Sequence, residues 1–157
     1  MKIITSDSDT CLIIPKKICI DDKIEMMKEI KHILLTYNKI YHFLSSGFYK
    51  VEVRFHKIIG TIFTISLLDD LSFIDNNVDL KIILIGETKV GLEFDDLIEP
   101  IDQLYYYKDH LYLVDFTNLS LFLTLLEHGT FILEDKVEEV LKNGKKISDI
   151  EVSKKFN

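Results

Sequence analysis

The sequence predicts an α+β fold with a mostly antiparallel sheet, one long amphipathic helix and a C-terminal hairpin–helix–strand–helix unit. Two observations point to this class. Short runs of β-branched and aromatic residues are separated by polar turns, which is typical of antiparallel strands. Helical periodicity is confined to segments of unequal length, which does not fit the regular strand–helix alternation of a doubly wound sheet.

The N-terminal part predicts two short strands followed by the long helix. Residues 1–4 and 10–14 are apolar runs on either side of a polar turn. Asp21 and Asp22 then offer an N-cap, with negative charge where the helix dipole favours it. We expect the helix to end at Gly47. Its apolar stripe, at helical spacing, comprises Ile24, Met27, Ile30, Leu34, Tyr37, Tyr41 and Leu44.

The middle of the chain predicts further strands. Residues 48–56 and 61–68 read as a strand pair joined by a short loop, the second strand being rich in Thr and Ile. The continuous apolar run 80–85 predicts a central strand. Another strand is expected at residues 90–94, after a turn.

The domain organisation follows from chain length and from one polar stretch. The 157 residues are enough to bury a core, most simply as one compact unit covering residues 1–157. Residues 69–79 are acidic and polar, and we expect a loop or a subdomain boundary there. The alternative is therefore two subdomains, 1–79 and 80–157.

The stretch 103–116 is the strongest hairpin signal, with two Tyr-, Leu- and Val-rich runs around a short polar turn. We expect Asp109 and His110 to form the turn. In that register the facing pairs are Tyr107 with Tyr112, Tyr105 with Val114 and Gln103 with Phe116. Both faces carry large apolar side chains, so one should pack on a core and the other should be covered or meet a partner.

The C-terminal part predicts two more helices. Asn118 is expected to cap a helix at 119–128 that is apolar all round and therefore buried. A short strand at 130–133 and a small helix at 135–142 follow, the helix ending at Asn143-Gly144. The remaining tail, which contains several lysines, is expected to fray.

Composition limits the class of protein. The apolar fraction of 47% and the charged fraction of 29% are ordinary for a folded protein. The net charge is −7 and the one arginine is Arg54, which argues against a nucleic-acid partner. Cys11 and Cys19 lie in apolar runs and are expected to be free thiols. No signal peptide opens the chain and no apolar run reaches membrane-spanning length, so a cytoplasmic protein is expected.

No pattern of reactive side chains predicts a catalytic, cofactor or metal site. The five histidines do not have metal-ligand spacing, and the two cysteines form no zinc motif. Pairs of acidic residues fall where helix starts and loops are expected, so capping explains most of them. No glycine-rich phosphate loop or nucleophile motif is present. We therefore predict that the protein is not an enzyme.

The positive functional signal is the concentration of tyrosines in the hairpin. Tyrosine combines a large contact area with a hydrogen-bonding hydroxyl, which protein interfaces use. Alternatively, the rings pack beneath a helix with their hydroxyls at its edge. The candidate partner surface, from the hairpin and the acids before it, comprises Tyr105, Tyr107, Tyr112, Glu93, Asp95 and Asp96.

Four segments occur in an order seen in a known family: LEFDDLIEP, LYYYKDHLYLV, LSLFLTLLEHG and VEEVLKNGKKI. With them, residues 91–147 resemble the C-terminal domain of the MecA-type adaptor proteins of low-GC bacteria. The stretch between LEFDD and the hairpin is shorter than the helix that the family has there, and residues 1–90 do not resemble the family's substrate-binding half. The resemblance implies a non-enzymatic adaptor that docks on a Clp-type AAA+ unfoldase, while its N-terminal part recruits a client.

The leading hypothesis is accordingly a protein–protein interaction module, an adaptor or regulator. One alternative is a small-molecule-binding or enzymatic domain with a site assembled from dispersed residues such as Glu52, Arg54 and His56. A thermal-shift screen with metabolites would detect such a site. The other alternative is a structural or self-associating protein, which sedimentation at several concentrations would reveal.

Overall fold

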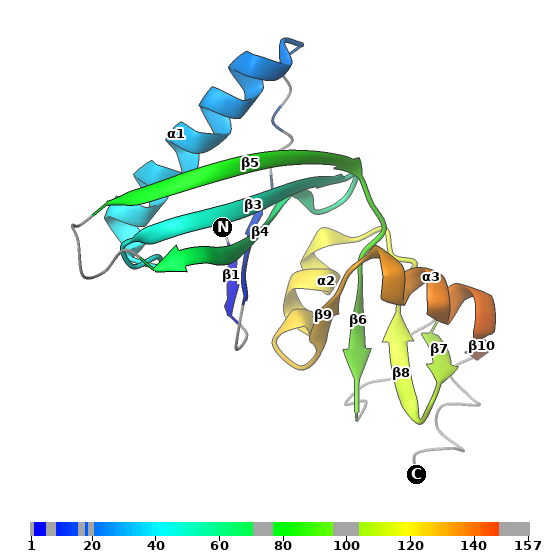
Figure 1. The fold of residues 1–157 in the computed structure, drawn as a ribbon. Helices are drawn as coiled ribbons and strands as arrows, with labels where there is room; N and C mark the ends of the chain where they lie inside the picture. The colour runs from blue at the N-terminus through cyan, green and yellow to red at the C-terminus, as the bar shows by residue number, and fades with distance from the viewer. Residues whose placement is uncertain are drawn as a thin grey trace. The chain divides into compact units, whose positions relative to one another are not determined.

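The protein is described here from a computed structural model (Figure 1). The described residues are 2–5, 9–15, 18, 21–70, 77–95 and 104–147. They form three helices and ten strands in two mostly antiparallel sheets, which confirms the predicted α+β class. The chain divides into a first unit, Met1–Glu87, and a second unit, Thr88–Asn157. No helix within the described ranges is both long and apolar enough to cross a membrane.

The first unit is a five-stranded sheet with one helix, and its strand order is β1-β2-β4-β3-β5. All neighbouring strands are antiparallel except β3 and β5, which run parallel. In chain order the elements are β1 (Lys2–Thr5), β2 (Asp9–Ile14), α1 (Lys23–Tyr41), β3 (Gly47–His56), β4 (Gly60–Asp70) and β5 (Val78–Glu87).

The core of the first unit lies between α1 and the sheet, where Figure 1 shows the helix running over β3 and β5. Alternate residues of β3 face this core, as the two-residue period of a strand requires. Ile30 and Leu34 of α1, four residues apart on one helix face, are fully buried against them. The middle of the predicted stripe therefore packs on the sheet, together with Met27 and Tyr37. Its ends do not, because Ile24 is 65% and Tyr41 52% exposed and Leu44 lies beyond the helix.

The two ends of α1 differ in how well local sequence predicts them. The expected cap at the start is confirmed, because Asp22 Oδ1 accepts hydrogen bonds from the backbone N–H groups of Ile24 (2.9 Å) and Glu25 (3.5 Å). The expected end at Gly47 is wrong. The helix stops at Tyr41, and His42 adopts a left-handed conformation with φ 52°.

Gly47 has a different role, since it opens β3 where the sheet is crowded. A Cβ atom at this position would lie 2.9 Å from Leu67 Cδ1 and 3.0 Å from the Asp69 carbonyl oxygen. Glycine therefore lets the start of β3 approach the end of β4 closely. The helix is instead closed by Asn38, whose side-chain oxygen accepts from the Leu44 N–H at 2.8 Å.

We expect Asp22→Ala to destabilise the protein by about 1 kcal/mol, because two N–H groups of the first helical turn lose their acceptor. Asp21→Ala is the matched control, since it removes the same charge next to the cap without removing the capping oxygen. Urea denaturation followed by circular dichroism measures both. Equal losses for the two variants would show that the charge matters and the cap does not.

The apolar run at residues 80–85 belongs to an edge strand, so the predicted central position is wrong. β5 pairs with β3 on one side, and the strand order places it last in the sheet. The expected boundary between residues 79 and 80 would cut this strand, whereas the contacts divide the chain after Glu87. Of the expected loop 69–79, residues 69–70 belong to β4 and 78–79 to β5, while 71–76 lie outside the described residues.

The second unit is also a five-stranded sheet, with strand order β10-β7-β8-β6-β9 and antiparallel pairs throughout. In chain order the elements are β6 (Gly91–Phe94), β7 (Leu104–Tyr107), β8 (His110–Leu113), α2 (Leu119–Leu126), β9 (Thr130–Ile132), α3 (Glu134–Asn143) and β10 (Lys145–Ile147). The start of the expected frayed tail is thus a strand, while residues 148–157 lie outside the described part.

The predicted hairpin exists, but its register is shifted. The turn is Lys108-Asp109, with φ angles of 49° and 65°, so Tyr105 faces Tyr112 and Tyr107 faces His110. Two consecutive positive φ angles are those of a mirror-image turn, whose twist matches that of the strands it joins. Tyr105, Tyr107 and Tyr112 still share one face, as the expected register also required.

The two helices cover opposite faces of the second sheet. Val137 and Val140 of α3 pack on the face that carries Tyr112. The Phe122 ring of α2 meets the Phe131 ring on the other face, at a centroid distance of 6.1 Å. The expected cap is confirmed by a hydrogen bond from the Leu121 N–H to Asn118 Oδ1 (3.1 Å), but α2 is not buried all round. Its buried residues are Phe122 and Leu126.

Candidate functional site

Four of the six residues of the predicted partner surface share one face of the second sheet: Glu93, Tyr105, Tyr107 and Tyr112. Tyr105 and Tyr112 face each other across β7 and β8, and Tyr112 in turn faces Glu93 on β6. Cross-strand partners share a face, and so do residues two apart along a strand, which adds Tyr107. Asp95 directly follows β6. Asp96, the sixth predicted residue, lies outside the described residues.

Tyr112 is a core residue, which corrects its assignment to an exposed surface. Its side chain is 1% exposed and packs with Val137 and Val140 of α3. The alternative, in which the rings pack beneath a helix, is therefore the correct one for Tyr112. Tyr105 and Tyr107 pack at the margin of the same cluster and remain partly exposed.

The Tyr112 hydroxyl connects this core to a polar cluster. It donates a hydrogen bond to Glu93 Oε2 at 2.8 Å. Burial raises the pKa of Tyr112, and the hydrogen bond to the Glu93 carboxylate raises it further. The tyrosine thus stays protonated and acts as a fixed donor that orients the Glu93 carboxylate.

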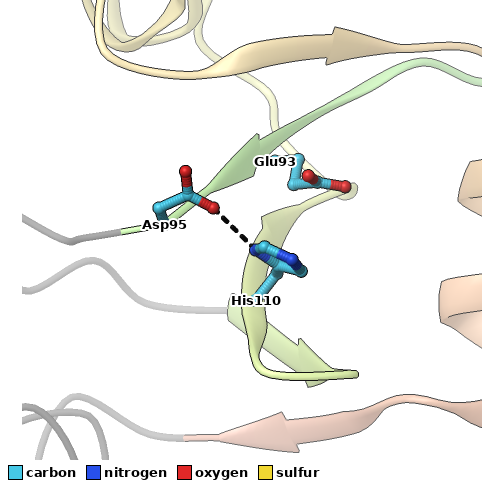
Figure 2. Close-up of side chains that lie close together, drawn as sticks. All are labelled: Glu93, Asp95 and His110. Atoms are coloured by element: carbon cyan, nitrogen blue, oxygen red, sulfur yellow. Dashed lines mark ion pairs between the residues drawn. The ribbon is translucent and has the colours of Figure 1, made fainter.

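Glu93, Asp95 and His110 form the polar cluster at the end of β6 and the start of β8 (Figure 2). One ligand-type atom of each residue lies within 4.8 Å of the other two. His110 Nδ1 is 2.7 Å from Asp95 Oδ1. The side chain of Asp95 is 84% exposed and that of His110 is 39% exposed, so the cluster opens to solvent.

His110 was not predicted as a site residue, because the five histidines are scattered along the chain without metal-ligand spacing. The expected register also placed it in the hairpin turn. With the turn at Lys108-Asp109, His110 begins β8 and lies on the same face as Tyr112. Only the pairing of β6 with β8 then brings the imidazole next to the two acids. One signal in the sequence could have indicated the cluster. Glu93 and Asp95 are two residues apart, and so are His110 and Tyr112, so each pair lies on one face of its strand and the two pairs can meet when the strands pair.

A second group of charges lies on the same face, around the Tyr107 ring. The Nζ atoms of Lys108 and Lys136 lie 5.2 and 5.6 Å from its centroid, which is cation–π distance. Lys136 Nζ also pairs with Glu139 Oε2 at 3.2 Å. The hydrogen bond from Lys136 lowers the pKa of Glu139. This part of the face therefore combines an aromatic ring with both signs of charge.

The alternative site of Glu52, Arg54 and His56 is engaged in holding the first sheet together. Arg54 pairs with Glu52 through an Nη2–Oε2 distance of 3.2 Å and reaches Thr64 Oγ1 at 3.4 Å. His56 Nδ1 accepts hydrogen bonds from the N–H groups of residues 58 and 59 in the β3–β4 turn. Burial, and then the Lys57 charge, lower the pKa of His56. All three residues thus make contacts within the first sheet, and the alternative site stays a prediction.

Cys11 is a free thiol, and it is poorly suited to nucleophilic chemistry. Burial raises the pKa of its thiol to about 12, against the opposing effect of the Arg54 charge. The thiolate, which is the reactive form, is therefore scarce at neutral pH. Cys19 lies outside the described residues.

Comparisons of the chain with protein-family models, with curated proteins and with solved structures gave no match. The resemblance of residues 91–147 to the MecA-type C-terminal domain therefore stays a prediction.

Proposed function

We propose that the protein is a non-enzymatic protein–protein interaction module of the adaptor type. The observation that carries the proposal is the partly exposed pair Tyr105 and Tyr107, held on the α3 face of the second sheet. The rings are anchored at one edge by the core around Tyr112, so their exposed edges present apolar area with little loss of conformational entropy on binding. We define Tyr105, Tyr107, Asp95, Lys108 and Lys136 as the hairpin surface.

The charges of the hairpin surface suit a protein partner. Lys108 and Lys136 lie over the Tyr107 ring, and the side chain of Asp95 in the polar cluster is 84% exposed. An aromatic centre with a charged rim is the usual anatomy of a protein interface. Charges of both signs favour a partner with a complementary pattern over a uniformly charged polymer.

The order of elements in the second unit supports an AAA+ unfoldase as the partner. After β6 come the tyrosine-rich hairpin, a leucine-rich helix followed by Gly129, a short strand and a closing helix followed by Gly144-Lys145. This is the order of motifs on which the family resemblance rests. In the proposal the second unit docks on the unfoldase, and the first unit recruits the client.

The test is affinity capture with the tagged full chain from native cytoplasm, with and without ATP, read by mass spectrometry. We expect a hexameric unfoldase to be retained, and Tyr105→Ser combined with Tyr107→Ser to reduce its retention at least about tenfold, as loss of interface hot spots does. Tyr106→Ser is the matched control, because Tyr106 lies on the same strand but on the opposite face.

Three outcomes separate the hypotheses. Retention that depends on Tyr105 and Tyr107 but not on Tyr106 supports the proposal. If all variants retain the unfoldase equally, the docking site does not lie on the hairpin surface. If no protein is retained in stoichiometric amount, the interaction hypothesis fails, and sedimentation and metabolite screening then test self-association and ligand binding.

A further inference from the structure

We infer that Glu93, Asp95 and His110 form a binding site for a divalent transition-metal ion, with zinc as the best-suited ion. The sequence alone predicted no metal site, because the three residues are separated along the chain and match no metal motif. The inference does not depend on the proposed interaction function. It rests on the geometry of the cluster, on its ligand chemistry and on the state of one nitrogen atom.

The spacing of the ligand atoms is close to that of a zinc site. All three lie within 4.8 Å of one another. Zinc bound at about 2.0–2.2 Å from each ligand holds its ligand atoms about 3.4 Å apart in tetrahedral geometry. Glu93 and His110 are carried by paired neighbouring strands, and Asp95, which directly follows β6, is 84% exposed and lies 2.7 Å from His110 Nδ1. The three ligand atoms are thus near enough for small side-chain rotations to bring them around one ion.

The ligand set selects the class of ion. Two carboxylate oxygens and one imidazole nitrogen suit zinc, and next to it manganese. Calcium and magnesium prefer all-oxygen sites, so the histidine argues against them. Three protein ligands leave at least one coordination position for water, which fits the solvent-facing side of the cluster.

The second observation is that His110 Nδ1 has no hydrogen-bond partner among the described residues. This atom is buried from solvent, yet it makes no hydrogen bond of acceptable geometry with any described residue. It lies 2.7 Å from Asp95 Oδ1, close enough for an ion pair but not aligned as a hydrogen bond. A buried nitrogen without an aligned partner is unfavourable, and a metal ion would satisfy it.

The surroundings supply the outer contact that metal sites require. The Tyr112 hydroxyl donates to Glu93 Oε2 at 2.8 Å and so fixes the orientation of this carboxylate. Hydrogen bonds of this kind orient metal-binding carboxylates and tune their affinity. The competing explanation is a protonated His110 that pairs with Asp95 and binds no metal. The experiment must separate a bound metal from a bound proton.

The test is calorimetric titration of the chelator-treated full chain with zinc chloride at neutral pH. We expect one zinc ion per chain, an affinity at least about tenfold lower for His110→Gln, and no change for His128→Gln. His128 is the matched control because it is an exposed histidine of the same unit. Asp95→Asn is expected to weaken binding as well, with the exposed Asp115→Asn as its control.

Two further measurements locate the site. Zinc should raise the thermal midpoint of the wild type and of His128→Gln but not that of His110→Gln, since only a bound ion stabilises the fold by mass action. Manganese should broaden the amide resonances around residues 93–95 and 110–112. If His110→Gln fails to fold, the Asp95→Asn variant is used for the test. The Asp95 side chain is mostly in solvent, so we expect this variant to fold.

Two results would overturn the inference. Absence of zinc binding by the wild type at millimolar zinc would leave the cluster as an ion pair of His110 and Asp95 that binds no metal. Unchanged binding by both His110→Gln and Asp95→Asn would place the zinc elsewhere on the chain. Loss of binding in these two variants, with retention in both controls, would establish the site.

Discussion

Replacing Tyr112 with alanine is expected to destabilise the second unit by about 3–5 kcal/mol, as the loss of a buried aromatic ring does. The ring is 1% exposed and packs against Val137 and Val140, so its removal leaves a cavity between the sheet and α3. The loss is a large part of the 5–15 kcal/mol that is typical of whole domains. Urea denaturation and hydrogen exchange of β6–β8 measure it.

Tyr112→Phe is the control that separates the ring from the hydroxyl. Phenylalanine keeps the packing and removes only the hydrogen bond to Glu93, for which we expect a loss of about 1–3 kcal/mol. If the alanine variant were no less stable than the phenylalanine variant, the ring would not belong to the core. Tyr112 would then be a binding residue, as the predicted partner surface had it.

Local sequence was sufficient for the helix starts and for the side chains that share a face. The Asp22 and Asn118 caps and the apolar stripe of α1 follow from spacing along the chain alone. The shared face of Tyr105, Tyr107 and Tyr112 was also predictable, because it depends on alternation within each strand and not on the register. These features required no knowledge of the rest of the chain.

The hairpin register and the order of strands in the sheet were not predictable. The hairpin turns at Lys108-Asp109, although neither residue is glycine, and the Tyr106 hydroxyl donates to Asp109 Oδ1 there at 2.7 Å. The apolar run of β5 is equally compatible with a central strand, and only the sheet order makes it an edge. Residues 80–85 thus show that an apolar run does not fix a strand's place in its sheet.

The candidate metal site was not predictable from the sequence either, because it also depends on the register of strand pairing. Glu93 lies on β6 and Asp95 directly follows that strand, but His110 joins them only because β8 pairs with β6 in a particular register. The register expected from the sequence placed His110 in the turn. A shift of one residue in the turn therefore decides whether this histidine is a loop residue or part of a cluster.

In the first unit, Phe63→Ala is expected to have the largest effect, also about 3–5 kcal/mol. Phe63 is 0% exposed and lies on β4 opposite Leu12 of β2 and Val53 of β3. Its ring therefore joins three neighbouring strands beneath α1. Leu68→Ala, on the same strand but 50% exposed, should lose less than about 1.5 kcal/mol, because much of its apolar area is already in water. Equal losses for the two variants would contradict the packing of β4.

The Phe63 and Tyr112 variants together test whether the two units unfold independently. Each variant removes a buried ring from one unit. Contacts within each unit account for the cores in which these rings lie. We therefore expect Phe63→Ala to accelerate hydrogen exchange in β2–β4 and Tyr112→Ala to accelerate it in β6–β8, each leaving the other set unchanged. Acceleration of both sets by either variant would mean that the chain opens as one cooperative unit, and that residues 1–87 and 88–157 are not separable in stability.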